Sequence, residues 1–222
     1  MIVSINGFLL HSRKYKETSS IIYIFSPLKG IQSLIFKGKY TNKDKFKFSI
    51  FNEYQFSYND KYKFPYLSKF EIISEYNFSK KYYLLGLYIN ELLYKTLKQG
   101  YDFEKVYENY KSFLQYLSRA SSNSISLALL FERNLLDNLG YGLNMHNEKR
   151  VIDNEDYYYD FDYGFKKVDN PQNQNCIKGN YLKEFFLNTL QSKKDTIFLR
   201  NIVRQILNKI YPEMTLNGDK LF

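Results

Sequence analysis

The stretch "GFLLHSRKYKETSSIIYIFSPLKGIQSLIFKGKY", residues 7–40, contains apolar runs separated by short polar or glycine-containing segments. Together with the residues just before it, this stretch supplies three runs rich in β-branched and aromatic side chains: Ile2 to Leu10, Ser19 to Phe25 and Ile31 to Lys37. Short runs of this composition, bounded by turn-forming residues, are typical of β-strands. The start of the chain therefore predicts three consecutive strands.

Two further strands are expected before residue 77. In "NEYQFSYN", residues 52–59, Tyr54, Phe56 and Tyr58 alternate with polar residues, which places the rings on one face of a strand. Leu67 to Ser74 predicts a fifth strand. Five short strands suit a small closed barrel, and the OB-fold is the common five-stranded solution. An SH3-like barrel or a small sandwich leaves much the same pattern, so strand number alone does not separate these folds.

Helical periodicity replaces the strand pattern near residue 80. Apolar residues recur at helical spacing over residues 80–100, 102–117, 124–142, 181–191 and 196–210. Residues 143–179 are acidic, then aromatic, then polar, and predict a ragged hairpin or an irregular insert. We therefore expect an α+β protein with a barrel domain at residues 1–77. An all-helical C-terminal domain that carries the insert is expected at residues 78–222.

Positive charge is concentrated in the barrel half of this 222-residue chain, whose formal net charge is +9. Residues 1–77 contain 12 basic and 6 acidic residues, whereas the rest of the chain contains 20 and 17. A basic surface favours a polyanionic partner, either nucleic acid or an anionic membrane. No apolar run approaches the roughly 18 residues of a membrane-spanning helix, and the first residues lack the basic region of a signal peptide. A cytoplasmic protein without a membrane partner is expected.

No catalytic constellation is evident in the sequence. The two histidines, His11 and His146, lie far apart, and neither belongs to an HExxH motif. Cys176 is the only cysteine, which excludes an intrachain disulfide and a cysteine-rich zinc site. Acidic residues cluster within residues 153–162, but without the spacing of a calcium-binding loop. The sequence therefore favours a protein that is not an enzyme and holds no cofactor.

A lysine-rich segment follows the third predicted strand. "KGKYTNKDKFKF", residues 37–48, contains one aspartate and five lysines: Lys37, Lys39, Lys43, Lys45 and Lys47. Lysines on a loop replace condensed counterions along a phosphate backbone, which gives sequence-independent, salt-sensitive binding. Exposed aromatic residues between them can stack on unpaired bases. A solvated loop is the alternative, and the charge asymmetry favours nucleic-acid binding.

Four blocks of the sequence together resemble RecO-type recombination mediator proteins. The first is residues 7–40, with His-Ser-Arg, Glu-Thr-Ser, an apolar strand, a Gly turn and a strand that ends in Lys-Gly. The others are "GLYINELLYKTL" (86–97), "LGYGLNM" (139–145) and the closing "LNGDKLF" (216–222). All four occur in the family's order across nearly the whole chain.

This resemblance implies an N-terminal OB-fold, a helical C-terminal domain and a role in DNA repair and recombination. It implies binding of single- and double-stranded DNA and annealing of complementary strands, without catalytic turnover. The implied partners are DNA, a RecR-type ring protein and the acidic C-terminal tail of the single-stranded-DNA-binding protein. A RecA-type recombinase would be served indirectly, by loading on coated DNA, and the protein would be associated with the nucleoid.

Within this resemblance, "HSRKYKETS" forms a corner between the first two strands. Arg13, Lys14 and Lys16 would contact phosphates or a partner there, together with the lysines of residues 37–48, and a solvated turn is the alternative. His11 is expected to pack at the end of a strand rather than to act in catalysis.

The chain departs from the family pattern in its second half. Some members hold zinc through four cysteines where this chain has only Cys176, so we expect aromatic packing in place of the metal. The aromatic residues of that region are Tyr157, Tyr158, Tyr159, Phe161 and Phe165. Leu129 and Leu130 stand where relatives often carry a basic pair that suits an acidic tail. Other cations are therefore the candidates for partner binding: Arg119, Arg133, Arg200 and Arg204.

Two of these cations, Arg200 and Arg204, are expected on the outer face of the last helix, opposite Phe198, Ile202 and Ile206. Other functions remain open at this point. An RNA-binding module of the same fold, or an adaptor whose basic face binds acidic tails, would have a similar composition.

Overall fold

A computed structural model describes the chain except residues 38–48, 63, 120–123, 144–150, 169–175 and 218–222. Contacts divide the chain into two compact units. The first consists of Met1–Ser121 and Thr215–Phe222, and the second of Ser122–Met214.

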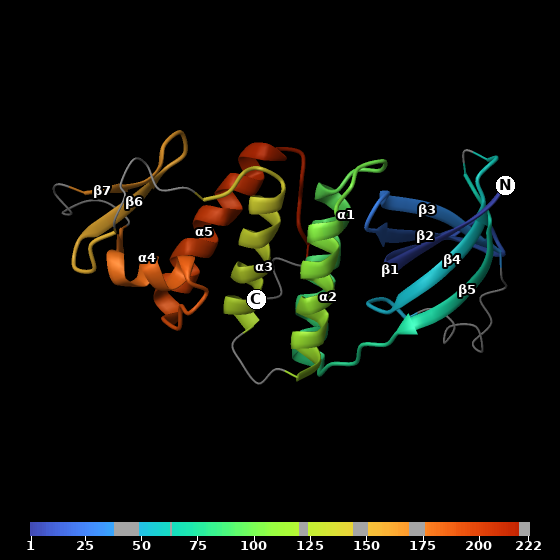
Figure 1. The fold of residues 1–222 in the computed structure, drawn as a ribbon, viewed down its shortest axis with the longest axis horizontal. Coiled ribbons are helices and arrows are strands. Elements are labelled where there is room, and N and C mark those ends of the chain that lie inside the picture. Colours follow the sequence, from blue (N-terminus) through green and yellow to red (C-terminus); the bar gives the residue numbers. More distant parts are fainter. Residues whose placement is uncertain (38–48, 63, 120–123, 144–150, 169–175, 218–222) are drawn as a thin grey trace. The chain divides into compact units, whose positions relative to one another are not determined.

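The first unit is built on a five-stranded antiparallel sheet in the order β3-β2-β1-β4-β5 (Figure 1). The strands are β1 (Ile2–Tyr15), β2 (Ser19–Ser26), β3 (Gly30–Lys37), β4 (Glu53–Asn59) and β5 (Leu67–Ser74). The edges of the sheet meet at one parallel bridge between Ile35 and Tyr66, where the Ile35 N–H donates to the Pro65 carbonyl at 2.9 Å. This strand order and partly open barrel are those of an OB-fold. The predicted α+β fold is confirmed, except that the described strands do not close the barrel completely.

The interior of the barrel follows the alternation in the sequence. Tyr54, Phe56 and Tyr58 of β4 are buried in one hydrophobic cluster with Ile22 and Leu34 from β2 and β3. Successive strand residues point to opposite faces of a sheet, so the period of two in residues 52–59 places all three rings inside. The sequence prediction for this strand is confirmed.

Two helices attach to the barrel where β1 bends. The pairing of β1 with β2 shifts register between Leu9 and His11, which leaves Leu10 without a partner across the ladder. The Leu10 carbonyl accepts a hydrogen bond of 2.9 Å from the side chain of Asn90, in α1 (Lys80–Thr96). Asn90 in turn accepts from the hydroxyl of Tyr110, in α2 (Glu104–Arg119). Because a bulge frees a backbone group, it creates an attachment point for both helices.

A buried carboxylate provides a second attachment. Glu53, at the start of β4, accepts a hydrogen bond of 2.8 Å from the Tyr107 hydroxyl and pairs with the Lys111 ammonium at 3.0 Å. Burial and the neighbouring carboxylate raise the pKa of Tyr107 far above its ordinary value, so Tyr107 remains a hydrogen-bond donor. The carboxylate therefore joins β4 to α2 through two donors.

The second unit combines three helices with a small sheet in the order β7-β6-β8. The helices are α3 (Ser124–Asn138), α4 (Gly179–Phe186) and α5 (Lys193–Ile210). The strands are β6 (Asp156–Asp160), β7 (Gly164–Lys167) and β8 (Ile177–Lys178). This unit therefore contains a small sheet as well as helices, and the hairpin considered for residues 143–179 is present as β6 and β7.

The β6–β7 turn has local causes. The Asp160 carboxylate accepts hydrogen bonds from the backbone N–H groups of Asp162 at 2.9 Å and Tyr163 at 3.0 Å. Gly164 follows with a φ of +83°, a conformation that glycine adopts at little cost. An aspartate that bonds to the backbone two residues on, followed by glycine, is sufficient to reverse the chain here.

Candidate nucleic-acid interface

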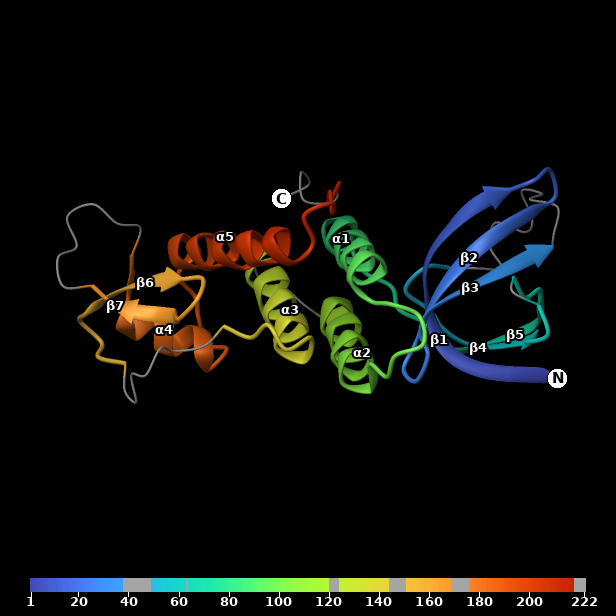
Figure 2. The ribbon, with the colours of Figure 1, turned by 90° about the horizontal axis from the view of Figure 1, so that it is seen from above.

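Four of the predicted cations lie at one end of the barrel. We call this group the basic end, and its members are Arg13, Lys14, Lys16 and Lys37. Tyr15 pairs with Ser19 across the β1–β2 turn, and Ser19 pairs with Lys37 at the end of β3. The register therefore brings Lys37 next to Lys16, in the turn, and next to the end of β1, which carries Arg13 and Lys14. Figure 2 shows this turn, the end of β3 and the start of β5 at the end of the barrel away from α1 and α2.

The four cations of the basic end are exposed, and three of them, Arg13, Lys16 and Lys37, lie over aromatic rings. The Arg13 guanidinium lies 5.6 Å from the centre of the Tyr23 ring, and the Lys37 ammonium lies 4.1 Å from the centre of the Tyr66 ring. Within the described part of the chain, none of the four cations forms an ion pair. A ring orients a cation without neutralising it, so the full charge remains available to an anionic ligand.

His11 belongs to an aromatic cluster beside these cations. Its imidazole stacks on the Tyr23 ring with centres 5.8 Å apart and planes 11° apart, and Tyr94 lies against both rings. Burial, and then the nearby Arg13 guanidinium, lower the pKa of His11. The neutral form of the imidazole is therefore favoured at pH 7.

The remaining predicted loop residues, Lys39, Lys43, Lys45 and Lys47, lie outside the described residues. The sequence reasoning also missed three exposed aromatic residues on the connection from β4 to β5: Tyr62, Phe64 and Tyr66. The signal was present in "KYKFPY", residues 61–66, where aromatic residues alternate with lysines just before a strand.

Two family models match the chain, one on each side of residues 77–79. A family model described as recombination protein O N terminal matches residues 1–76, and the corresponding C-terminal model matches residues 80–208. The chain belongs to the RecO family. It is 30% identical to a DNA repair protein RecO from Psychromonas ingrahamii over 72% of this chain and 71% of the relative. It is also 30% identical to the DNA repair protein RecO of Salmonella paratyphi B over 80% of this chain and 76% of the relative.

In this RecO-family chain, Arg200 is not on the outer face of the last helix, contrary to the sequence expectation. It is buried in α5, and its Nε lies 3.1 Å from a carboxylate oxygen of Glu132, which is fully buried in α3. The buried stripe of α5 includes Leu199, Ile202 and Val203, so Arg200 shares the inner face with apolar residues. An Arg in the interior requires a buried anion, and Glu132 supplies it.

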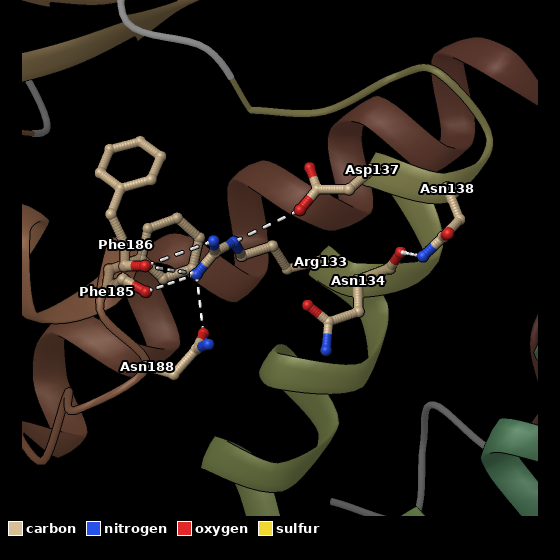
Figure 3. Close-up of polar contacts among 7 residues, drawn as sticks. All are labelled: Arg133, Asn134, Asp137, Asn138, Phe185, Phe186 and Asn188. Carbon is tan, nitrogen blue, oxygen red and sulfur yellow. Dashed lines mark hydrogen bonds and ion pairs between the residues drawn. The ribbon is translucent and has the colours of Figure 1, made fainter. Parts of the chain in front are cut away.

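Arg133 also has intramolecular contacts, at the end of α4 (Figure 3). Its guanidinium donates to the carbonyl of Phe185 at 2.6 Å and to the side-chain oxygen of Asn188 at 2.8 Å. It lies 4.9 Å from the centre of the Phe185 ring and 3.7 Å from the Asp137 carboxylate. The last carbonyls of a helix have no partner within the helix, and a cation that binds them stabilises its end.

The two other cations proposed for partner binding have different surroundings. Arg119 is the last residue of α2 and is exposed. Arg204 is half-buried in α5, one turn beyond Arg200. Arg133 and Arg200 are therefore held by intramolecular contacts, and Arg119 and Arg204 belong to different units.

For some family members, the resemblance implies a zinc site of four cysteines in the region of residues 143–179. Cys176 is the only cysteine, and burial raises the pKa of its thiol, which opposes the thiolate that zinc requires. No group of three or more potential metal ligands occurs in the part of the chain that the structure describes. The small sheet is packed with rings instead: Tyr157 and Phe165 are buried, and Tyr159 lies 5.0 Å from Phe165.

Among the helices that the structure describes, none is both long and apolar enough to cross a bilayer.

Proposed function

We propose that this chain is a non-enzymatic recombination mediator in DNA repair. It binds single- and double-stranded DNA, anneals complementary strands and helps to load a recombinase on DNA that is coated by single-stranded-DNA-binding protein. The observation that supports this proposal most strongly is the basic end of the barrel, in a chain that belongs to the RecO family. Curated relatives of the chain carry the name DNA repair protein.

The annealing mechanism follows from charge neutralisation. Cations that lie against phosphates release condensed counterions and reduce the repulsion between two single strands. The basic end supplies such cations from the end of β1, the β1–β2 turn and the end of β3, and the lysines of residues 39–47 add to them. No bond is made or broken, so an enzyme active site is not required.

The partners in this proposal are a RecR-type ring protein, the acidic tail of the single-stranded-DNA-binding protein and, indirectly, a RecA-type recombinase. Arg119 is the exposed cation that best suits an acidic tail, because Arg133 and Arg200 already have partners within the second unit. A cytoplasmic, nucleoid-associated location accompanies this function.

The proposal is tested by reversing charge at the basic end. The triple variant Arg13→Glu, Lys14→Glu and Lys37→Glu should weaken DNA binding at all sequences and lower the slope of log K against log salt by roughly 2 to 3. It should also slow the annealing of complementary fluorescent oligonucleotides. A matched control reverses three exposed lysines elsewhere in the same unit: Lys80, Lys98 and Lys105. Equal losses in both variants, or an unchanged salt slope in the first, would contradict the proposal.

A further inference from the structure

The β4–β5 connection presents exposed rings that the described core does not use. Tyr62 is 58% exposed and Phe64 is 59% exposed, although rings of this size are usually buried in a soluble domain. The two residues are separated by one position, so their Cα atoms lie no more than about 7 Å apart. They are therefore close enough to contact successive units of one extended ligand.

The connection is positioned by the barrel rather than by the rings themselves. Pro65 accepts the hydrogen bond from Ile35 of β3, and Tyr66 forms the bridge to the same residue. These contacts fix the chain directly after Phe64 against the opposite edge of the sheet. Exposed rings on a backbone fixed in this way have the character of a preformed contact surface.

Positive charge lies directly beside the rings. The Lys37 ammonium lies 4.1 Å from the centre of the Tyr66 ring, and Lys61 is exposed immediately before Tyr62. Lys37 also belongs to the basic end, so the rings continue the surface that is proposed to neutralise phosphates. A ligand that fits here has a polyanionic backbone and flat apolar groups, and both features occur together in a single-stranded nucleic acid.

We propose that Tyr62 and Phe64 stack on unpaired bases and give the barrel its preference for single-stranded over double-stranded DNA. In a duplex the base faces are covered by neighbouring base pairs, so the rings have nothing to stack on, and only the cations contribute. This inference rests on the proposed function, because it assumes that the basic end binds DNA. It assigns strand preference to the rings and salt-dependent affinity to the cations.

The experiment measures the affinity of the full chain for three probes of about 16 units, the upper site size of one OB-fold. The probes are an oligothymidylate, a sugar-phosphate strand of the same length without bases, and a blunt duplex. The double variant Tyr62→Ala and Phe64→Ala should lose roughly 5- to 150-fold in affinity for oligothymidylate per ring removed. Its affinity for the other two probes should stay within about twofold of the unaltered protein, and its salt slope should not change.

Two controls separate stacking from general effects. Tyr101→Ala removes an equally exposed ring, 59% exposed, from the α1–α2 connection of the same unit and should change none of the three affinities. The exchange Tyr62→Phe and Phe64→Tyr keeps two rings in place and should retain the binding of oligothymidylate. Thermal unfolding of each variant establishes that the barrel is intact.

The possible results distinguish the two proposals. An equal loss for all three probes, or no loss for any of them, overturns the role of the rings and leaves the basic end untouched. A double variant that changes only the oligomeric state assigns the rings to contact between copies of the chain, which also overturns it. If the unaltered protein binds none of the probes at low salt, the proposed function itself fails.

Discussion

Removing one partner of the Glu132–Arg200 pair should destabilise the second unit strongly, whereas removing both should not. The Glu132 side chain has no exposed surface and that of Arg200 is 5% exposed, with their nearest charged atoms 3.1 Å apart. At this distance and an effective dielectric constant near 20, the attraction is about 5 kcal/mol. That attraction offsets the cost of removing both charges from water.

The variants Glu132→Leu and Arg200→Met each leave the other charge buried, which should lower the free energy of unfolding by about 3–5 kcal/mol. In the double variant neither charge remains, and two apolar side chains occupy similar volumes. The double variant should therefore be more stable than either single variant, within about 1 kcal/mol of the unaltered protein. Urea unfolding, together with hydrogen exchange of peptides from α3 and α5, measures these differences in the unit concerned.

The matched control is Lys209→Met, which removes another cation of α5. Lys209 lies 3.7 Å from Asp162, but the two side chains are 64% and 80% exposed. An exposed pair of this kind contributes no more than about 1 kcal/mol. If the double variant is as unstable as the sum of the two single variants, or if Lys209→Met costs as much as Arg200→Met, the account of the buried pair is refuted.

Three further predictions concern the first unit. His11 should titrate below 6.5, because burial and a neighbouring guanidinium lower its pKa. The folded state then binds fewer protons than the unfolded state. The contribution of His11 to stability is therefore fully present above about pH 6.5 and declines as the pH falls through that value. Proton NMR titration measures this, and His11→Gln should abolish that contribution. Gly30→Ala should lower the melting temperature more than Gly100→Ala, because a Cβ at Gly30 would lie 2.1 Å from a backbone carbonyl oxygen, while at Gly100 it meets open space; equal shifts would contradict this. Tyr107→Phe should cost about 1–3 kcal/mol in urea unfolding, since Glu53 then keeps one donor fewer while buried, and a loss below about 0.5 kcal/mol would contradict it.

The elements of the barrel were predictable because each strand carries its own signal. The alternation of Tyr54, Phe56 and Tyr58 and the glycine between the second and third strands are local features that the fold retains. The bulge at Leu10 was not predictable, because its cause lies in a partner far along the chain. Asn90 is 80 residues away, and only the folded structure shows that its side-chain amide donates a hydrogen bond to the Leu10 carbonyl.

Charged residues were the least predictable part of the candidate site. An arginine in an amphipathic helix is expected on the exposed face, because an unpaired charge is too costly to bury. Arg200 is buried only because Glu132 lies opposite it, 68 residues away in the sequence. Arg133 similarly contacts carbonyls at the end of a helix that begins more than forty positions later. Helical periodicity describes one helix at a time and contains no information about such pairs.

Cations in the two units differ in their surroundings. In the second unit, five lysines of the small sheet, α4 and α5 each lie within 4 Å of a carboxylate. These are Lys166, Lys167, Lys178, Lys183 and Lys209. Their charge is largely compensated within the protein, so they attract a phosphate backbone only weakly.

Three cations of the basic end, Arg13, Lys16 and Lys37, have rings as neighbours instead. The Lys37–Tyr66 contact leaves the ammonium charged and oriented. A polyanion therefore gains more by approaching the basic end than by approaching the five paired lysines of the second unit. Net charge alone does not distinguish these two groups of cations. Their partners do, and this difference supports the proposal that the barrel binds DNA and that Tyr62 and Phe64 stack on its bases.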